Sequence, residues 1–194
     1  VNGPSLFAVC QSEGPLAVGR LLGLARQICK GLHDAHNAEP AVIHRDIKPE
    51  NIMLGVDGHG REQVKLVDFG LAILLGDPKA ASTGGTPAYM SPEQCQGLAA
   101  DARADIYALG ASLYELACGR LPFLGQTADE VRAAHLNRQP DPPSRWMEGE
   151  LPPSFEALIL RCLSKRPDQR YSSAAELEAA LIEVQLELQL STPH

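Results

Sequence analysis

Two aspartates, one asparagine and one lysine in or after the segment VIHRDIKPENIML, which runs from Val42 to Leu54, could do chemistry together. Asp46, Lys48 and Asn51 fall within six positions, and Asp68 follows a short turn-rich stretch. Phosphoryl transfer needs a group that orients and deprotonates the attacking hydroxyl, oxygen ligands for Mg²⁺, and a cation near the transferred group. These side chains supply all three requirements if the fold brings them together.

Two apolar runs, NIML at 51–54 and VKLV at 64–67, flank the glycine- and aspartate-rich stretch GVDGHG. This pattern predicts a β-hairpin, with Asn51 at the start of its first strand and Asp68 just after its second. The hairpin would return Asp68 beside Asn51, while Asp46 would end a strand-to-loop passage. The turn glycines do not indicate a phosphate-binding loop, because no strand-then-helix context surrounds them.

Helical patterns cover much of the remaining chain. An apolar stripe from Leu21 to Ala35 predicts a long helix that stops near NAEP, since Pro40 disfavours helical geometry before it. Residues 71–96 are rich in Gly, Ser, Thr and Pro and predict a long loop. Further helices are expected over Asp105–Cys118, after the capping box TADE at 127–130, over about 154–164, and after the capping box Ser173–Glu176.

Several motifs together resemble those of protein kinases. HRDIKPEN at 44–51 and DFG at 68–70 are similar to the family's catalytic and metal-binding loops. GTPAYMSPE at 85–93 is similar to its P+1 loop, and DIYALG at 105–110 resembles its central helix. The motifs occur in the family's order and cover nearly the whole chain, so the resemblance is specific.

The resemblance implies a role for each candidate residue of the cleft. Asp46 would position the substrate hydroxyl and accept its proton, and Lys48 would neutralise charge on the transferred phosphoryl group of ATP. Asn51 and Asp68 would hold Mg²⁺, or Mn²⁺ in its place. Met53 would form the floor of the adenine site.

Other implied roles concern regulation and substrate binding. Arg45 would pair with a phosphate on the long loop, for which Ser82 and Thr83 are the candidate acceptors. Either one is equally well explained as a solvated loop residue. Thr86 would contribute to the substrate site near Asp46.

The remaining implied roles are structural. Asp105 would anchor the backbone of the catalytic loop, and an ion pair between Glu93 and Arg170 would tie the P+1 loop to the helical block. His44 and Phe69 are expected to pack rather than to react.

The implied fold is α+β and kinase-like: a mostly helical C-terminal lobe with a small β-hairpin sheet at the catalytic cleft. Residues 1–194 would form one partial kinase domain without its N-terminal lobe, because no Gly-rich loop precedes Asp46 and Lys30 is the only earlier lysine.

The Lys48-Pro49-Glu50 segment and Thr86 resemble the serine/threonine branch, and GTPAYMSPEQ resembles the eukaryotic-like kinases of bacteria. The implied partners are the absent lobe, protein substrates with Ser or Thr acceptors, and a second copy for trans-autophosphorylation.

Composition narrows the partners and the location. The net charge of −7 argues against nucleic-acid binding, which depends on Lys and Arg. The five dispersed cysteines favour buried thiols in a reducing compartment over disulfides or zinc. His33 and His36 could share a helix face, where a solvated or capping role is favoured over metal binding. We therefore expect a cytoplasmic domain, even if a membrane anchors the parent protein.

Two other functions remain as alternatives. A pseudokinase or scaffold would bind protein partners without catalysis, and it usually lacks Asp46, Asn51 or Asp68, all of which are present. A small-molecule phosphotransferase of the antibiotic-kinase type shares an H-x-D-x-x-x-x-N loop. The Lys48 position, the DFG triplet and the peptide-receiving GTPAYMSPE segment disfavour it.

We expect the 194 residues by themselves to transfer phosphate at a negligible rate and to aggregate. They contain no element to clamp the α- and β-phosphates of ATP, and apolar surface made to face the other lobe would be exposed. A phosphorylation assay with labelled ATP and a generic protein acceptor measures this. Robust transfer by the isolated chain would contradict the expectation.

Overall fold

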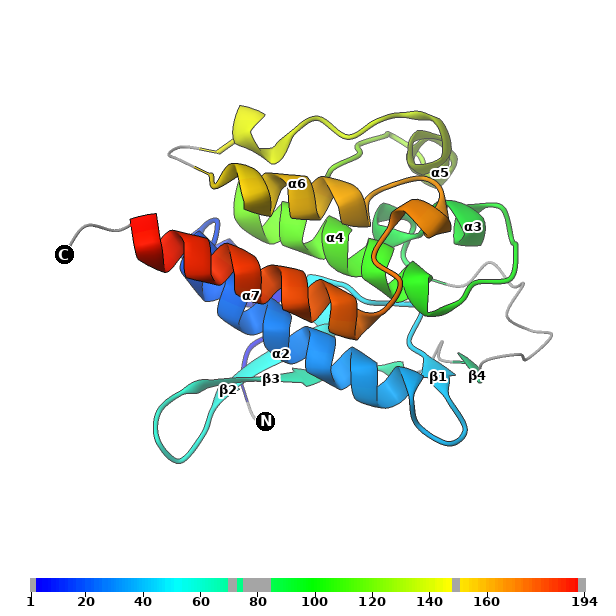
Figure 1. Cartoon of the computed structure of the whole chain (residues 1–194). Helices are drawn as coiled ribbons and strands as arrows, with labels where there is room; N and C mark the ends of the chain where they lie inside the picture. Colours follow the sequence, from blue (N-terminus) through cyan, green and yellow to red (C-terminus); the bar gives the residue numbers. More distant parts are fainter. Residues whose placement is uncertain (1–2, 70–72, 75–84, 148–150, 192–194) are drawn as a thin grey trace.

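The computed structural model describes residues 3–69, 73–74, 85–147 and 151–191. They form a mostly helical body with small antiparallel strand pairs at one edge (Figure 1). This arrangement confirms the α+β class predicted from the sequence. Within the described residues, no helix is both long enough and apolar enough to cross a lipid bilayer.

The elements follow one another in the predicted order, with some additions. The helices are α1 Leu6–Glu13, α2 Val18–His36, α3 Pro92–Cys95, α4 Ala102–Cys118, α5 Ala128–Asn137, α6 Pro153–Cys162 and α7 Ala174–Ser191. The strands are β1 Val42–Ile43, β2 Ile52–Val56, β3 Glu62–Leu66 and β4 Ile73–Leu74. Short 3-10 segments occupy Pro49–Asn51, Pro87–Tyr89, Pro143–Arg145 and Pro167–Gln169.

Helix α2 carries the predicted apolar stripe and ends where the sequence indicated. Leu21, Ala25, Ile28 and Leu32 are completely or almost completely buried. One side of α2 packs against α7 and another against β3, so it lies between the helical block and the hairpin (Figure 1). The apolar stripe therefore fixes the hairpin, and the residues that flank it, to the helical core.

Helix α4 runs through the centre of the helical block, and 14 of its 17 residues are buried. It begins three residues earlier than predicted, because the Asp101 carboxylate accepts a hydrogen bond from Arg103 N at 2.8 Å and caps it. It stops at Gly119 as predicted. The φ of 67° at Gly119 is a left-handed conformation that glycine adopts without strain.

The predicted hairpin is confirmed: β2 and β3 pair antiparallel, with Ile52 opposite Leu66 and Val56 opposite Glu62. The carboxylate of Asp57 accepts hydrogen bonds from His59 N and Arg61 N and closes the turn.

The prediction of an uninterrupted loop over 71–96 was wrong at its two described ends. Strand β4 pairs with β1, and α3 begins at Pro92 after the N-cap Ser91, whose hydroxyl and Gln94 form a reciprocal capping box. Pairing with β1 depends on a strand some thirty residues earlier, which local sequence patterns do not reveal.

Both predicted capping boxes start helices, but with a shifted return contact. Thr127 and Ser173 accept hydrogen bonds from the backbone N–H of Glu130 and Glu176. Each glutamate carboxylate then accepts from the residue before the cap, at Gln126 N and Ser172 N. The glutamates still satisfy free backbone donors at the helix starts.

The packing of α4 on α6 can be tested at Gly110. A β-carbon there would lie 2.5 Å from Cys162 Cβ on α6, so we expect Gly110→Ala to destabilise the fold by about 1–3 kcal/mol. The matched change Gly23→Ala in α2 meets no atom within 4 Å and should stabilise by about 0.5–1 kcal/mol through helix propensity. Urea unfolding of both variants measures the difference. Equal stabilities would contradict the close contact.

Candidate active site

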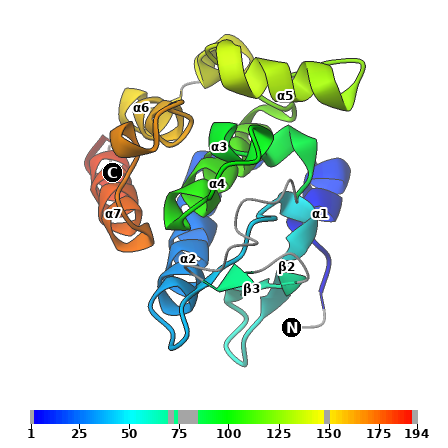
Figure 2. The same ribbon diagram turned by 90° about the vertical axis from the view of Figure 1, so that its right-hand side faces the viewer.

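Asp46, Lys48 and Asn51 lie in the HRD loop, residues 44–51 between β1 and β2, and Thr86 and Asp105 lie in segments that contact it. This loop lies between the hairpin and the beginning of α4 (Figures 1 and 2). Asn51 is the last residue of the 3-10 segment Pro49–Asn51, rather than the first residue of β2 as predicted. The 3-10 turn shortens the path from Asp46 to Asn51 and places both in one small region.

Asp105, in the first turn of α4, holds the backbone of the HRD loop. Its fully buried carboxylate accepts hydrogen bonds from Arg45 N at 2.8 Å and from His44 N at 2.9 Å. Arg45 has a φ of 67°, which residues with a β-carbon seldom adopt. The two bonds to one carboxylate stabilise this conformation, and the next residue, Asp46, is oriented by it.

His36 also binds Asp105, which corrects the expectation of a solvated or capping histidine. Its Nε2 lies 2.8 Å from Asp105 Oδ2, and its side chain is 8% exposed. His33 contributes to the end of α2, where its carbonyl accepts from Asn37 N and its Nδ1 lies 3.1 Å from Asn37 Nδ2. Among the described residues, no three His, Cys, Asp or Glu side chains are grouped closely enough to hold a metal ion.

Asp46, Lys48 and Thr86 contact one another pairwise. Lys48 Nζ lies 2.8 Å from Asp46 Oδ2 and donates to Thr86 Oγ1 at 2.6 Å. Thr86 donates to Asp46 Oδ1 from its backbone N at 3.0 Å and from its hydroxyl at 2.9 Å. The structure therefore joins a residue of the P+1-like segment to the carboxylate of the HRD loop.

The electrostatics of this cluster keep the Asp46 carboxylate ionised. Burial raises the pKa of Asp46, but the hydrogen bonds from Lys48 and Thr86 outweigh burial and bring the pKa below its ordinary value. The carboxylate thus accepts hydrogen bonds at neutral pH. It is a weak base in this state, because a lower pKa means a lower proton affinity.

Asn51 is oriented by Asp46. Its Nδ2 donates to Asp46 O at 2.9 Å and to Asp46 Oδ2 at 3.0 Å, which uses both amide hydrogens. The oxygen Oδ1 is then the group that Asn51 can offer to a cation. These two hydrogen bonds fix which side of the amide carries the nitrogen and which carries the oxygen.

The hairpin brings Asp68 beside Asn51, as predicted. Val67 N donates to Asn51 O at 3.0 Å, so Asp68 follows directly after a backbone contact with Asn51. Asp68 has a φ of 62°, a turn of the backbone that directs the chain away from β3. One carboxylate and one amide oxygen fit a divalent cation such as Mg²⁺, which uses few protein ligands and completes its shell with phosphates and water.

His44 does more than pack. Its Nε2 donates to Val67 O at 3.1 Å, and Asp46 N lies 3.3 Å from its Nδ1, so the imidazole connects the HRD loop to the end of β3. The Phe69 ring lies 4.4 Å from the His44 ring and remains 44% exposed. The expectation of packing therefore describes only part of the role of His44.

Two further predicted residues have clear places. Met53 lies in β2, opposite Lys65, and forms a bridge to Ser5. Arg45 is buried, and burial lowers its pKa while the nearby Asp105 opposes the shift. Its predicted phosphate acceptors, residues 82 and 83, lie outside the described residues, so that pairing stays a prediction.

The Glu93–Arg170 pair is fully formed and buried. Arg170 donates from both terminal nitrogens to the two carboxylate oxygens of Glu93, at 2.7 and 2.8 Å. Its three other N–H groups donate to the carbonyls of Ser164, Arg103 and Lys165. All five donors of the guanidinium are satisfied, which offsets the cost of burying the charge.

Sequence reasoning missed two contacts that hold the segment after Thr86. The Tyr89 hydroxyl donates to Glu115 on α4, and His135 on α5 binds the Ala88 carbonyl. Glu115 offered a signal, since it is a carboxylate in the apolar second half of the helix sequence, ASLYELAC at 111–118. The pKa of Glu115 is raised, chiefly by burial.

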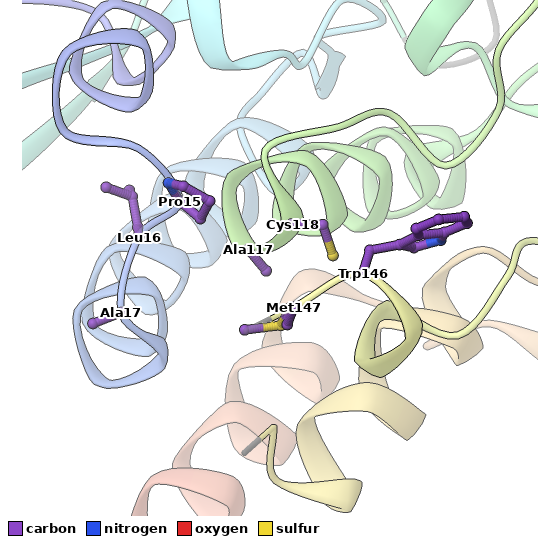
Figure 3. A pocket seen from close by; sticks show the side chains of 7 residues that line it. All are labelled: Pro15, Leu16, Ala17, Ala117, Cys118, Trp146 and Met147. Carbon is purple, nitrogen blue, oxygen red and sulfur yellow. The ribbon is translucent and has the colours of Figure 1, made fainter. Parts of the chain in front are cut away.

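A separate cavity of about 580 Å³ opens at the far end of α4 (Figure 3). None of its seven lining residues is an acid, a base or a metal-binding histidine; they are Pro15, Leu16, Ala17, Ala117, Cys118, Trp146 and Met147. It lies roughly 20 Å along the helix from Asp105, because α4 rises about 1.5 Å per residue. The cavity is therefore not part of the site around Asp46.

Comparison with known proteins shows the family to which this chain belongs. The chain matches the protein kinase domain over residues 1–182. It is 39% identical over 189 residues to the serine/threonine-protein kinase PknB of Mycolicibacterium smegmatis, covering 95% of this chain and 29% of that protein. It is 41% identical over 189 residues to the serine/threonine-protein kinase pkn3 of Myxococcus xanthus, covering 93% of this chain and 34% of that protein.

The chain thus spans about a third of the length of these relatives. PknB of Mycobacterium tuberculosis is similar to the same extent, with 38% identity over 95% of this chain. The match extends from the first residue through the HRD loop, the hairpin and α4. The chain belongs to the protein kinase domain family and is similar to bacterial serine/threonine kinases.

Proposed function

We propose that the protein containing this chain transfers the γ-phosphoryl group of ATP to serine or threonine hydroxyls of protein substrates. The observation that carries the proposal is the contact of Asp46, Lys48 and Thr86. It joins an ionised acceptor, a cation and the start of residues 86–89, here called the substrate segment, within hydrogen-bonding distance. The names of the similar bacterial proteins agree with it.

Asp46 is the residue that would orient the acceptor hydroxyl. Its two oxygens already accept four hydrogen bonds, from Thr86 N, Thr86 Oγ1, Lys48 Nζ and Asn51 Nδ2. A carboxylate has about four acceptor sites, so a substrate hydroxyl must replace one donor. Lys48 is the donor best able to leave, because its flexible ammonium group can turn toward the transferred phosphoryl group.

The reaction then requires little covalent chemistry from the protein. Asp46 aligns the hydroxyl and takes its proton as the bond to phosphorus forms, while Lys48 stabilises the charge on the phosphoryl oxygens. Asn51 Oδ1 and Asp68 would hold the divalent cation, for which we propose Mg²⁺. When bound, this cation neutralises the phosphate charge of ATP. Met53 would lie under the adenine.

The proposal extends to partners and regulation. An N-terminal lobe would complete the ATP site, and a second copy of the protein would phosphorylate Ser82 or Thr83 in trans. Arg45 would then receive that phosphate, because a phosphate adds about two negative charges for a guanidinium to bind. We place the domain in the cytoplasm, where ATP is available.

Substituting Asp46→Asn in the full-length protein tests the proposal. We expect kcat for phosphate transfer from ATP to casein to fall by about 10²–10⁴-fold, because Asn orients a hydroxyl poorly and accepts no proton. The matched control is Asp129→Asn, at a carboxylate whose side chain is 92% exposed on α5; its kcat should remain at the wild-type value. Circular dichroism would verify that both variants fold.

Transfer that survives Asp46→Asn at the wild-type rate would remove the role assigned to Asp46. A wild-type protein that binds ATP but phosphorylates neither itself nor casein would instead indicate a scaffold.

A further inference from the structure

His135 connects three elements of the structure through one buried side chain. It lies near the end of α5 and is completely buried. Its Nε2 lies 3.1 Å from the carbonyl oxygen of Ala88, in the 3-10 segment Pro87–Tyr89. Its Nδ1 lies 2.8 Å from the hydroxyl of Tyr107 on α4. The imidazole therefore links α5 to the substrate segment and to the central helix at once.

The chemistry of the partners fixes the tautomer of His135. A carbonyl oxygen only accepts hydrogen bonds, so Nε2 carries the proton and donates to Ala88. Nδ1 then has no proton and accepts from the Tyr107 hydroxyl. Each ring nitrogen has one partner of the right kind, so the side chain is fully satisfied and held in one orientation.

The surroundings keep this imidazole neutral. Burial, together with the positive charge of Lys165, lowers the pKa of His135 to about 4. Lys165 Nζ donates to the carbonyl of His135 at 2.7 Å, and the guanidinium of Arg170 lies over the Tyr107 ring. The Phe123 ring packs edge-on against the imidazole at 4.8 Å. A second proton on His135 would add a cation beside two others.

Three anchors hold the substrate segment, residues 86–89. Thr86 binds Asp46 and Lys48 at its beginning, and Tyr89 binds Glu115 on α4 at its end. The Ala88 carbonyl, between them, is held by His135. The first anchor belongs to the reacting groups, and the other two come from the helical block. His135 is thus a hydrogen-bonded contact between α5 and this segment.

We propose that His135 is a positioning residue for the protein substrate, and that it acts by fixing the Ala88 carbonyl and with it the segment next to the acceptor hydroxyl. The inference rests on the proposed kinase function. ATP binding should not depend on this contact, since Asn51, Met53 and Asp68 belong to the hairpin region. Helix α5 and the hairpin lie on opposite sides of the described residues (Figures 1 and 2).

Two conservative variants of the full-length protein separate the two hydrogen bonds. In His135→Asn the short amide can still accept from Tyr107 but cannot reach Ala88. In His135→Gln the longer amide places an N–H near the position of Nε2 and can still donate to Ala88. Each variant loses one hydrogen bond, so the two should have similar melting temperatures.

Steady-state kinetics with casein and MgATP as the probes provide the measurement. We expect His135→Asn to raise KM for casein about three- to tenfold, the effect of one lost hydrogen bond, with KM for ATP unchanged. His135→Gln should keep the wild-type KM for casein. Tyr107→Phe removes only the other bond and should also keep it.

Each result either supports or overturns the positioning role of His135. A rise confined to His135→Asn and to casein supports the positioning role. An unchanged KM in His135→Asn, or equal rises in all three variants that follow their melting temperatures, overturns it in favour of a purely structural histidine. If the wild-type protein transfers no phosphate to casein or to itself, the proposed kinase function is wrong. If the wild-type protein is active but His135→Asn leaves KM for casein unchanged, only the role proposed for His135 is wrong.

Discussion

The arrangement of the active site depends on one buried carboxylate. Asp105 has no solvent contact, and a buried carboxylate is tolerable only when hydrogen-bond donors replace the lost water. Its donors come from the HRD loop and from the end of α2, two segments that are far from α4 in the sequence. Because two of these donors are the backbone N–H groups of His44 and Arg45, satisfying the carboxylate also sets the left-handed turn that orients Asp46.

From that anchor the polar contacts continue outward without a break. Asp46 accepts from Lys48, Asn51 and Thr86, and His44 connects the same loop to the end of β3. Such networks are strong when every member is satisfied and costly when one is removed. The site is therefore pre-organised before any ligand binds, yet its acceptor is already occupied. Under the proposed function, phosphates and a hydroxyl would exchange partners within this network rather than build it.

The helical block holds Glu93 and residues 86–89 through buried polar contacts, as Asp105 holds the HRD loop. Arg170 ties the α3 residue Glu93 to the chain between α6 and α7, with all its donors used. His135 and Glu115 hold the segment after Thr86 from α5 and α4. Both the HRD loop and residues 86–89 thus rest on α4, which contributes Asp105 near its start and Glu115 near its end. The nearly complete burial of this helix gives both anchors a rigid base.

Much of this protein could be predicted from local sequence. The apolar stripe of α2, the hairpin around its glycine-rich turn, and the end of α4 at Gly119 all follow from the spacing of apolar residues and the backbone preferences of Gly and Pro, which act over a few residues. The motif residues Asp46, Lys48, Asn51 and Asp68 could be assigned to one site, because the hairpin brings its two ends together whatever surrounds it.

Contacts between distant segments could not be read in this way. His36 and Asp105 are 69 positions apart, and Ala88 and His135 are 47 apart, so neither pair leaves a local pattern. The same holds for β4, which forms a strand only because β1 is available to pair with it. The sequence by itself determined which chemical groups the site contains and which elements carry them. Only the tertiary structure decided which histidines hydrogen-bond to residues of the site, because an imidazole takes its role from whichever donor and acceptor the packing places beside it.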